Sequence, residues 1–190
     1  MKESNSLEKS IKNAEKHFLI TQQNFDVVNN TCREMIRECA RGITYIHNDK
    51  IGEAQEILKS IEKKHKSLST FEDRFGYIIM QAYQEMAEMQ IFYDIKNNNL
   101  IPTPNNLGIN YDSYILGLMD VVGELKREVL NALHKNDIES AKKYYNKMVE
   151  IYDTTRHIRF AEPILPGFRK KQDVARIQIE NAGSDILKRS

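Results

Sequence analysis

Residues 111–134, YDSYILGLMDVVGELKREVLNALH, carry the pattern that decides the fold. Apolar side chains recur there at steps of three and four, as on a helix packed against other helices; they are Ile115, Leu118, Val122, Leu125, Val129 and Leu133. The following HKND predicts a short connection, with Asp137 as the N-cap of a second helix over 137–157 and Glu139 in its first turn. Together the two segments predict an antiparallel helix pair.

Helical periodicity extends over most of the remaining chain. Residues 7–47 contain no Pro and a single Gly, Gly42, and their apolar spacing predicts one very long helix. Shorter periodic segments and two Pro-containing breaks complete the pattern: helices over 52–68, 71–97 and 168–187, and breaks over 97–110 and 161–168. With no Trp, 8 Gly, 4 Pro and 29% charged residues, we expect an all-α, single-domain bundle over residues 1–190, with six to seven helices and a very long N-terminal helix.

Charge and apolar content exclude several classes of protein. The net charge is +1, from 28 Lys and Arg against 27 Asp and Glu, which argues against a chain devoted to non-specific polyanion binding. The sequence has no apolar leader and no run of 18 apolar residues, so we expect a cytoplasmic protein with no membrane association. Cys32 and Cys39 are too far apart along one helix for a disulfide, and two thiols alone do not make a zinc site.

Two pairs of carboxylates have spacings that stack them on one helical face: Glu85 with Glu88, and Asp120 with Glu124. Like charges at these spacings repel, so a chain that carries two such pairs is a candidate for cation binding. Mg²⁺, with Mn²⁺ as a substitute, prefers oxygen ligands and keeps several waters. The pattern is therefore compatible with a divalent-ion site formed by two helices.

The alternative for these acids is a solvent-exposed helix face, which is where charged residues usually lie. On the segment 111–134, the acids fall opposite the apolar stripe, on the side of Gly117 and Glu128. On the segment 71–97, they lie between two apolar stripes: the main one is Phe75, Ile78, Ala82, Met86, Met89 and Tyr93, and the weaker one is Met80, Ala87 and Ile91. Spacing alone leaves both interpretations open.

The segment from residue 112 also matches a family motif. The pattern D-Y-[LI]-x-G-x-x-D-x-x-G-E-x-x-R is met by Asp112, Tyr114, Gly117, Asp120, Gly123, Glu124 and Arg127, with Ser113 inserted between the first two. Residues 37–49, RECARGITYIHND, and 168–187, FRKKQDVARIQIENAGSDIL, match further family segments in the same order. On these residues the chain resembles the translin and TRAX family, closest to its archaeal TRAX-like branch.

The resemblance implies a metal-dependent endoribonuclease. Glu85 with Glu88, and Asp120 with Glu124, match the E-x-x-E and D-x-x-x-E pairs that form the Mg²⁺-dependent centre of TRAX. It implies metal-assisted hydrolysis of single-stranded RNA, or of RNA enclosed in an oligomeric shell. Asp120, Glu85 and Glu124 are expected to face the metal, with Glu88 as base or water ligand. Attack by water would leave 5′-phosphate and 3′-hydroxyl ends.

Several cations are candidates for holding RNA beside these acids. Arg33, Arg37 and Arg41 repeat at i,i+4 and predict a ridge that contacts phosphates without reading bases. The alternative is a solvated face neutralised by Glu34 and Glu38.

Three smaller sets of residues are weaker candidates. Lys126 and Arg127 lie two and three positions after Glu124 and are expected to balance the acidic charge beside RNA. A C-terminal basic run is typical either of RNA contact or of a solvated helix start: Phe168, Arg169, Lys170, Lys171 and Arg176. Glu62 and His65 form one E-x-x-H, where a di-iron site needs two, so we interpret them as surface residues.

The resemblance also implies a homo-oligomer, expected to be a closed octamer. A first helix of about 40 residues would extend roughly 60 Å, beyond one compact domain. Neighbouring chains are therefore expected to bury either Leu7, Ile11 and Phe18 or the C-terminal Ile179 and Ile186.

Two other functions stay open beside the nuclease. The first is a non-catalytic, translin-type protein that binds single-stranded RNA or DNA. The second is a structural helical oligomer whose carboxylates face solvent.

Overall fold

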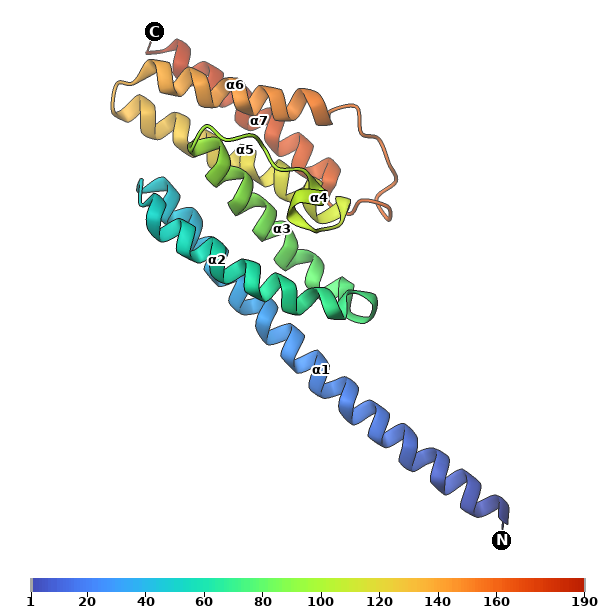
Figure 1. Ribbon diagram of the computed structural model, residues 1–190. Coiled ribbons are helices and arrows are strands. Elements are labelled where there is room, and N and C mark those ends of the chain that lie inside the picture. The colour runs from blue at the N-terminus through green and yellow to red at the C-terminus, as the bar shows by residue number, and fades with distance from the viewer. Residues whose placement is uncertain (1, 190) are drawn as a thin grey trace.

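The computed structural model of the chain describes residues 2–189, and all of its regular elements are helices (Figure 1). In chain order they are α1 (Lys2–His47), α2 (Ile51–Leu68), the 3-10 turn η1 (Ser69–Phe71), α3 (Glu72–Lys96), α4 (Pro104–Leu107), α5 (Tyr111–His134), α6 (Ile138–Thr155) and α7 (Phe168–Leu187). None of the described residues lies in a strand, which confirms the predicted all-α architecture. No helix within the described part of the chain is long and apolar enough to cross a membrane.

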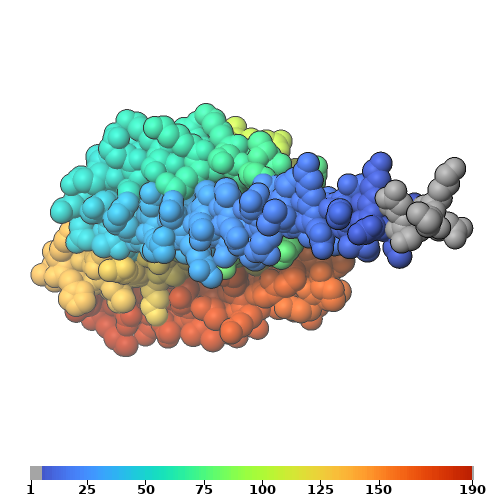
Figure 2. Space-filling model, turned by 90° about the horizontal axis from the view of Figure 1, so that it is seen from below, coloured from blue at the N-terminus to red at the C-terminus, as the bar shows by residue number. Residues whose placement is uncertain are grey.

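The N-terminal half of α1 projects away from the other helices (Figure 1), and Figure 2 shows the same helix extending beyond the packed body. With 46 residues, α1 is roughly 70 Å long at 1.5 Å per residue. Its buried seam runs only from Val28 to Ile46. Before this seam, large apolar side chains are exposed: Leu7, Ile11, Phe18, Leu19, Ile20 and Val27. These residues are available to a neighbouring chain.

The C-terminal alternative for an interface is wrong. Ile186 is buried and Ile179 is partly buried within the chain itself. α7 packs on α5 and α6, so these two side chains are covered within the chain, although Val174, Ile177 and Leu187 of the same helix are exposed. The exposed part of α1 is therefore the better candidate for contact between chains.

α3 is the central helix, packed between α1 and α5 (Figure 1). The two stripes expected for this helix are only partly right. Ala87 and Ile91, placed in the weaker stripe, are fully buried, whereas Ile78 and Tyr93, placed in the main stripe, are partly buried. Because neighbours cover α3 on several sides, its burial does not follow one helical face.

α5, on which Gly117 and Glu128 were predicted to face solvent, is also buried on two sides. α5 packs on α3 as well as on α6 and α7, and both residues are buried. At Gly117, a Cβ atom would lie 2.5 Å from the Gln84 carbonyl oxygen and 2.9 Å from the Ala87 Cβ. Nearby, the Ser113 hydroxyl donates to the Met80 carbonyl at 3.0 Å. Glycine at 117 therefore permits the two backbones to approach closely.

The connections agree with the expected turn chemistry, with one addition. The Asp137 carboxylate accepts a hydrogen bond from the Ser140 N–H at 2.9 Å, which confirms the predicted N-cap. The break expected over 97–110 contains the short helix α4, which Thr103 and Asn106 cap reciprocally. Sequence periodicity did not indicate α4, because a single turn is too short to show a period.

Gly117→Ala should destabilise the protein. Alanine in a helix interior normally gains up to about 1 kcal/mol over glycine, but overpacking against α3 should cost about 1–3 kcal/mol. Urea denaturation measures the difference. Gly123→Ala, on the same helix, is the control, because its Cβ would meet only the Gln178 side chain at 3.4 Å. Equal stabilisation by both substitutions would contradict the close contact at Gly117.

Candidate functional site

The four predicted acids lie at the junction of α3, α5 and α7. Glu85 and Glu88 are one turn apart on α3, and Asp120 and Glu124 are one turn apart on α5. Gln84 Nε2 donates to Asp120 Oδ2 at 2.7 Å, which joins the two helices at this level. The close contact at Gly117 includes the Glu88 backbone nitrogen, 3.1 Å from the position of the absent Cβ. The two acid pairs, far apart in sequence, are thus neighbours in the fold.

Glu88 is the most deeply placed acid of the four, with 8% of its surface exposed. Burial, and then the nearby carboxylates of the other three acids, raise the pKa of Glu88 to about 9. Burial and the charge of Asp120 likewise raise the pKa of Glu85. No described residue donates a side-chain hydrogen bond to Glu85 or Glu88. At neutral pH, Glu88 therefore holds its proton in the metal-free protein.

Asp120 is paired with a cation from α7. Lys171 Nζ forms an ion pair with Asp120 Oδ1, while Gln84 binds the other oxygen. The Lys171 charge also acts against the upward shift of the Glu85 and Glu88 pKa values. The sequence had placed Lys171 in a basic run for RNA contact, and the structure places it on an acid of the candidate site instead.

Glu124 is bound by His47, the last residue of α1. His47 Nε2 forms an ion pair with Glu124 Oε2, and His47 Nδ1 lies 2.6 Å from Glu128 Oε1. Lys96 Nζ then donates to Glu128 Oε2 at 2.6 Å. Sequence reasoning did not assign a role to His47, Glu128 or Lys96. The available signals were the position of His47 in the family-like segment 37–49 and the i+4 spacing of Glu128 from Glu124.

The solvent-facing interpretation of the acids does not hold for Glu88, and the side chains of Asp120 and Glu124 are only 24% and 25% exposed. Among the described residues, no three His, Cys, Asp or Glu side chains are arranged to hold one metal ion in this conformation. The donor chemistry nevertheless fits a hard divalent ion, because the four acids offer carboxylate oxygens alone. Within residues 2–189, Glu85 and Glu88 have no competing side-chain donors, and Lys171 occupies Asp120 as a competing cation.

A hollow of about 390 Å³ opens between α5 and α7 beside this site. Asp120, Lys170 and Lys171 are among its lining residues, together with Gly123 and Gln178. The two lysines at the edge of this hollow are donors that a phosphate next to the carboxylates could use.

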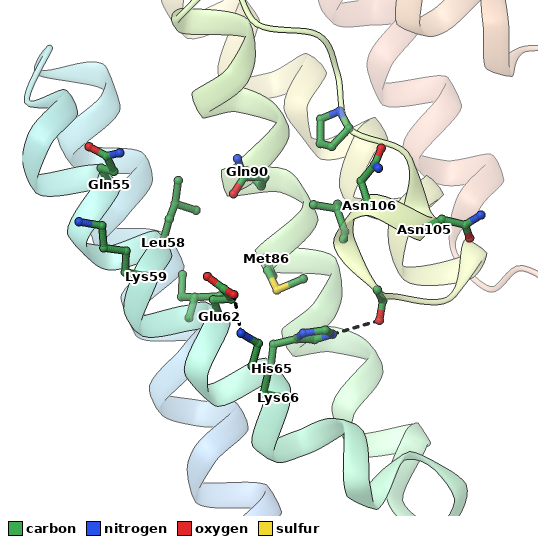
Figure 3. Close-up of a pocket in the computed structure, with 14 residues that line it drawn as sticks. Gln55, Leu58, Lys59, Glu62, His65, Lys66, Met86, Gln90, Asn105 and Asn106 are labelled. Atoms are coloured by element: carbon green, nitrogen blue, oxygen red, sulfur yellow. Dashed lines mark hydrogen bonds and ion pairs between the residues drawn. The ribbon is translucent and has the colours of Figure 1, made fainter.

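A larger hollow, of about 570 Å³, lies between α2, α3 and α4 (Figure 3). Glu62 pairs with Lys66 at 2.7 Å, and His65 Nε2 lies 3.0 Å from the Gly108 carbonyl oxygen, so the E-x-x-H residues do not converge on one point (Figure 3). Met86 and Gln90 of α3 line this hollow, and none of the four acids does. This arrangement agrees with interpreting Glu62 as a surface residue.

The predicted arginine ridge is exposed on α1. Arg33, Arg37 and Arg41 form no ion pair with any described residue. Glu38, one of their expected neutralising partners, instead pairs with Lys64 of α2 at 3.1 Å. The arginines are therefore available for phosphates.

The ridge passes the level of the acidic site. Burial, and then the negative charges of Glu85 and Glu88, raise the pKa of the Cys39 thiol, so this turn of α1 faces the acids. Arg37 and Arg41 flank Cys39 two residues away on either side, on the solvent-facing surface of α1.

The other predicted cations do not form one continuous surface. Lys126 is half-buried and Arg127 is exposed on α5, and no described residue forms an ion pair with either of them. In the C-terminal run, Arg169 donates to the Phe160 carbonyl and Arg176 pairs with Glu180. With Lys171 bound to Asp120, that run does not form one RNA-binding cluster.

The chain matches the model of the Translin family over residues 4–183, and it belongs to that family. This result confirms the resemblance inferred from the sequence motifs. A relative, the uncharacterized protein MJ0175 of Methanocaldococcus jannaschii, is 36% identical over 160 residues, which cover 82% of this chain and 71% of the relative.

Solved structures of two C3PO proteins are similar to the chain over almost its whole length. The crystal structure of AfC3PO has a TM-score of 0.84 at 27% identity and covers 94% of this chain and 96% of its own. AfC3PO in a duplex RNA complex has a TM-score of 0.85 at 26% identity, covering 94% and 95%. Apo-NeC3PO, with a TM-score of 0.87 at 19% identity over 95% and 97%, supports the fold alone.

Glu88 should make the stability of the metal-free protein fall as pH rises. A carboxyl whose pKa is raised from 4.5 to about 9 on folding stabilises fully below about pH 4.5, and this contribution is lost as pH rises toward 9. Glu88→Gln does not titrate, so the variant should gain stability relative to the wild type across that range. Urea denaturation at several pH values measures this.

The control is Glu56→Gln on the exposed surface of α2. It should show the same pH dependence as the wild type. If Glu88→Gln also retained the wild-type pH dependence, Glu88 would not be protonated in the folded protein.

Proposed function

We propose that this member of the Translin family is an endoribonuclease that requires Mg²⁺, with Mn²⁺ as a substitute. The observation that carries the proposal is the junction of Glu85, Glu88, Asp120 and Glu124, in which Glu88 is buried with no side-chain donor from any described residue. Repulsion among these acids destabilises the metal-free site, and a bound cation would relieve it. The similarity to AfC3PO, which has been solved in complex with duplex RNA, supports RNA as the substrate class.

The roles proposed for the acids follow from their surroundings. Asp120, Glu85 and Glu124 would hold the ion, which when bound would stabilise negative charge on the phosphoryl group. Glu88 is the candidate base or water ligand. Its deep position raises its pKa, so it can take up and release a proton more readily than a carboxylate that stays charged. Lys171 pairs with Asp120 and lines the neighbouring hollow, so it would be free to contact a phosphate there if Asp120 held the ion instead.

The form of the RNA is part of the proposal. The family-based expectation is single-stranded RNA, whereas the AfC3PO complex contains duplex RNA. Cleavage of one labelled strand, alone and annealed to its complement, distinguishes the two forms. Faster cleavage of the unpaired strand would support the single-stranded form, and faster cleavage of the annealed strand would contradict it.

We also propose that the chain forms a homo-oligomer, an octamer by resemblance to its family. The exposed apolar side chains on the projecting half of α1 support contact with other copies. Light scattering should give a mass several times the 22.2 kDa of one chain. A mass of one chain would contradict this assembly.

Substituting single acids should abolish Mg²⁺-dependent cleavage. Glu85→Gln, Asp120→Asn and Glu124→Gln each remove a proposed ligand, so the loss should exceed the roughly 10–100-fold effect typical of outer-shell partners. Glu85→Gln should keep or raise stability without metal, because it relieves repulsion. The other two should lose some stability, because Asp120→Asn removes the ion pair of Lys171 and Glu124→Gln removes one of the two ion pairs of His47. Cleavage of a short labelled RNA, with and without EDTA, measures activity.

Glu62→Gln in the unrelated hollow is the control and should cleave normally. Wild-type cleavage rates in any two of the three acid variants would contradict the proposal that these acids form the catalytic site. RNA binding without any cleavage by the wild type would favour the non-catalytic alternative, which the Lys171 contact on Asp120 also supports.

Replacing Arg33, Arg37 and Arg41 together with Gln should weaken binding of different RNA sequences about equally. Each lost phosphate contact should reduce the slope of log affinity against log salt by roughly 0.7–0.9. Fluorescence anisotropy at several salt concentrations measures the slope.

The matched control replaces Lys9, Lys12 and Lys16 with Gln, which removes the same charge from the projecting half of α1. An unchanged salt slope in the arginine variant would place the ridge outside the RNA path.

A further inference from the structure

We propose that His47 is a positioning residue that directs the Glu124 carboxylate into the acidic site, and that Glu128 and Lys96 hold His47 in place. The inference rests on the proposed metal-dependent function. It assigns a task to three buried or half-buried residues that hold none of the reacting groups themselves.

His47 contacts two carboxylates through its two ring nitrogens. Nε2 forms an ion pair with Glu124 Oε2, and Nδ1 lies 2.6 Å from Glu128 Oε1. The His47 side chain is 2% exposed, so water does not compete for either nitrogen. Two carboxylates accept from both nitrogens only if both donate, which requires the imidazolium form. His47 therefore acts as a fixed cation between two anions.

The surroundings of His47 favour the same charge state. Burial alone would lower the pKa of His47, but the hydrogen bonds and charges of Glu124 and Glu128 raise it. His47 also ends α1, where the negative end of the helix dipole favours a cation.

Lys96 binds the Glu128 oxygen that does not contact His47, and Asn131 shares the other oxygen with His47. Lys96 Nζ donates to Glu128 Oε2 at 2.6 Å, and Asn131 Nδ2 donates to Glu128 Oε1 at 3.1 Å. Burial would raise the pKa of Glu128, but its bonds to His47 and Lys96 lower the pKa to about 2. Lys96 in turn donates to Asp49 at 3.0 Å. Alternating charges thus extend from Glu124 through the interior to the surface.

Packing fixes the plane of the imidazole as well. The Phe92 ring lies against His47, with ring centroids 4.8 Å apart. Phe92 belongs to α3 and is fully buried, so the ring rests on the central helix. His47 can therefore transmit a fixed orientation to Glu124.

The consequence for Glu124 is that its two oxygens differ. Oε2 is taken by His47, while no described residue bonds to Oε1, which leaves that oxygen for a metal ion. Without His47, the flexible Glu124 side chain would have no partner to hold it in this rotamer. Outer-shell partners that orient a ligand in this way typically change metal affinity by about 10–100-fold.

The test measures Mn²⁺ binding by electron paramagnetic resonance in the RNA-free oligomer, beside circular dichroism for folding. His47→Gln and Glu128→Gln should each raise the Kd for Mn²⁺ by about tenfold or more while the protein stays folded. Glu128→Gln is informative because its side chain touches His47 and not Glu124. His134→Gln is the control, since this exposed histidine of α5 bonds only to the Leu130 carbonyl of its own helix.

The outcomes separate this inference from the proposed function. If the wild type does not bind Mn²⁺, the metal-dependent function itself fails. If the wild type binds Mn²⁺ and both folded variants bind it with the same Kd, the positioning role of His47 is overturned. If both variants fail to fold where the wild type and His134→Gln fold, the network serves stability and the inference is also overturned.

Discussion

The close approach of α5 to α3 at Gly117 is the constraint on which the acidic site depends. A side chain there would collide with the Gln84 carbonyl oxygen, so the helices could not pack at their present separation. That separation brings the acid pair of α5 beside the acid pair of α3 and buries Glu88 between them. The glycine of a family motif thus has a packing role, while a chemical role is proposed for the acids of the same motif.

Like charges at this junction are balanced in three ways. Lys171 neutralises Asp120, His47 neutralises Glu124, and Glu88 keeps its proton because burial and its acidic neighbours raise its pKa to about 9. If a divalent ion binds as proposed, we expect it to replace Lys171 and the Glu88 proton, since the lysine is half-buried and the proton can leave, while His47 stays on Glu124. Under the proposed function, the same groups that stabilise the metal-free fold would therefore set the affinity for the ion.

Local features could be predicted from the sequence, and long-range contacts could not. The helices over 111–134 and 168–187 have the predicted bounds, and Asp137 caps α6, because periodicity and capping are local properties. The acids were identified by spacing and motif. Their partners His47 and Lys171 were not, because each lies more than 50 positions from the acid it binds and spacing says nothing about such pairs. The burial of α3 was likewise misjudged, since a central helix has no single apolar face.

We propose that the four acids bind a divalent ion, which replaces the Lys171 cation on Asp120 and the proton on Glu88. Calorimetric titration of Mn²⁺ into the RNA-free protein near neutral pH, in two buffers of different ionisation enthalpy, tests it by counting protons. Binding should release about one proton per ion in the wild type and much less in Glu88→Gln. Absence of binding, or equal proton release by both proteins, would contradict the account.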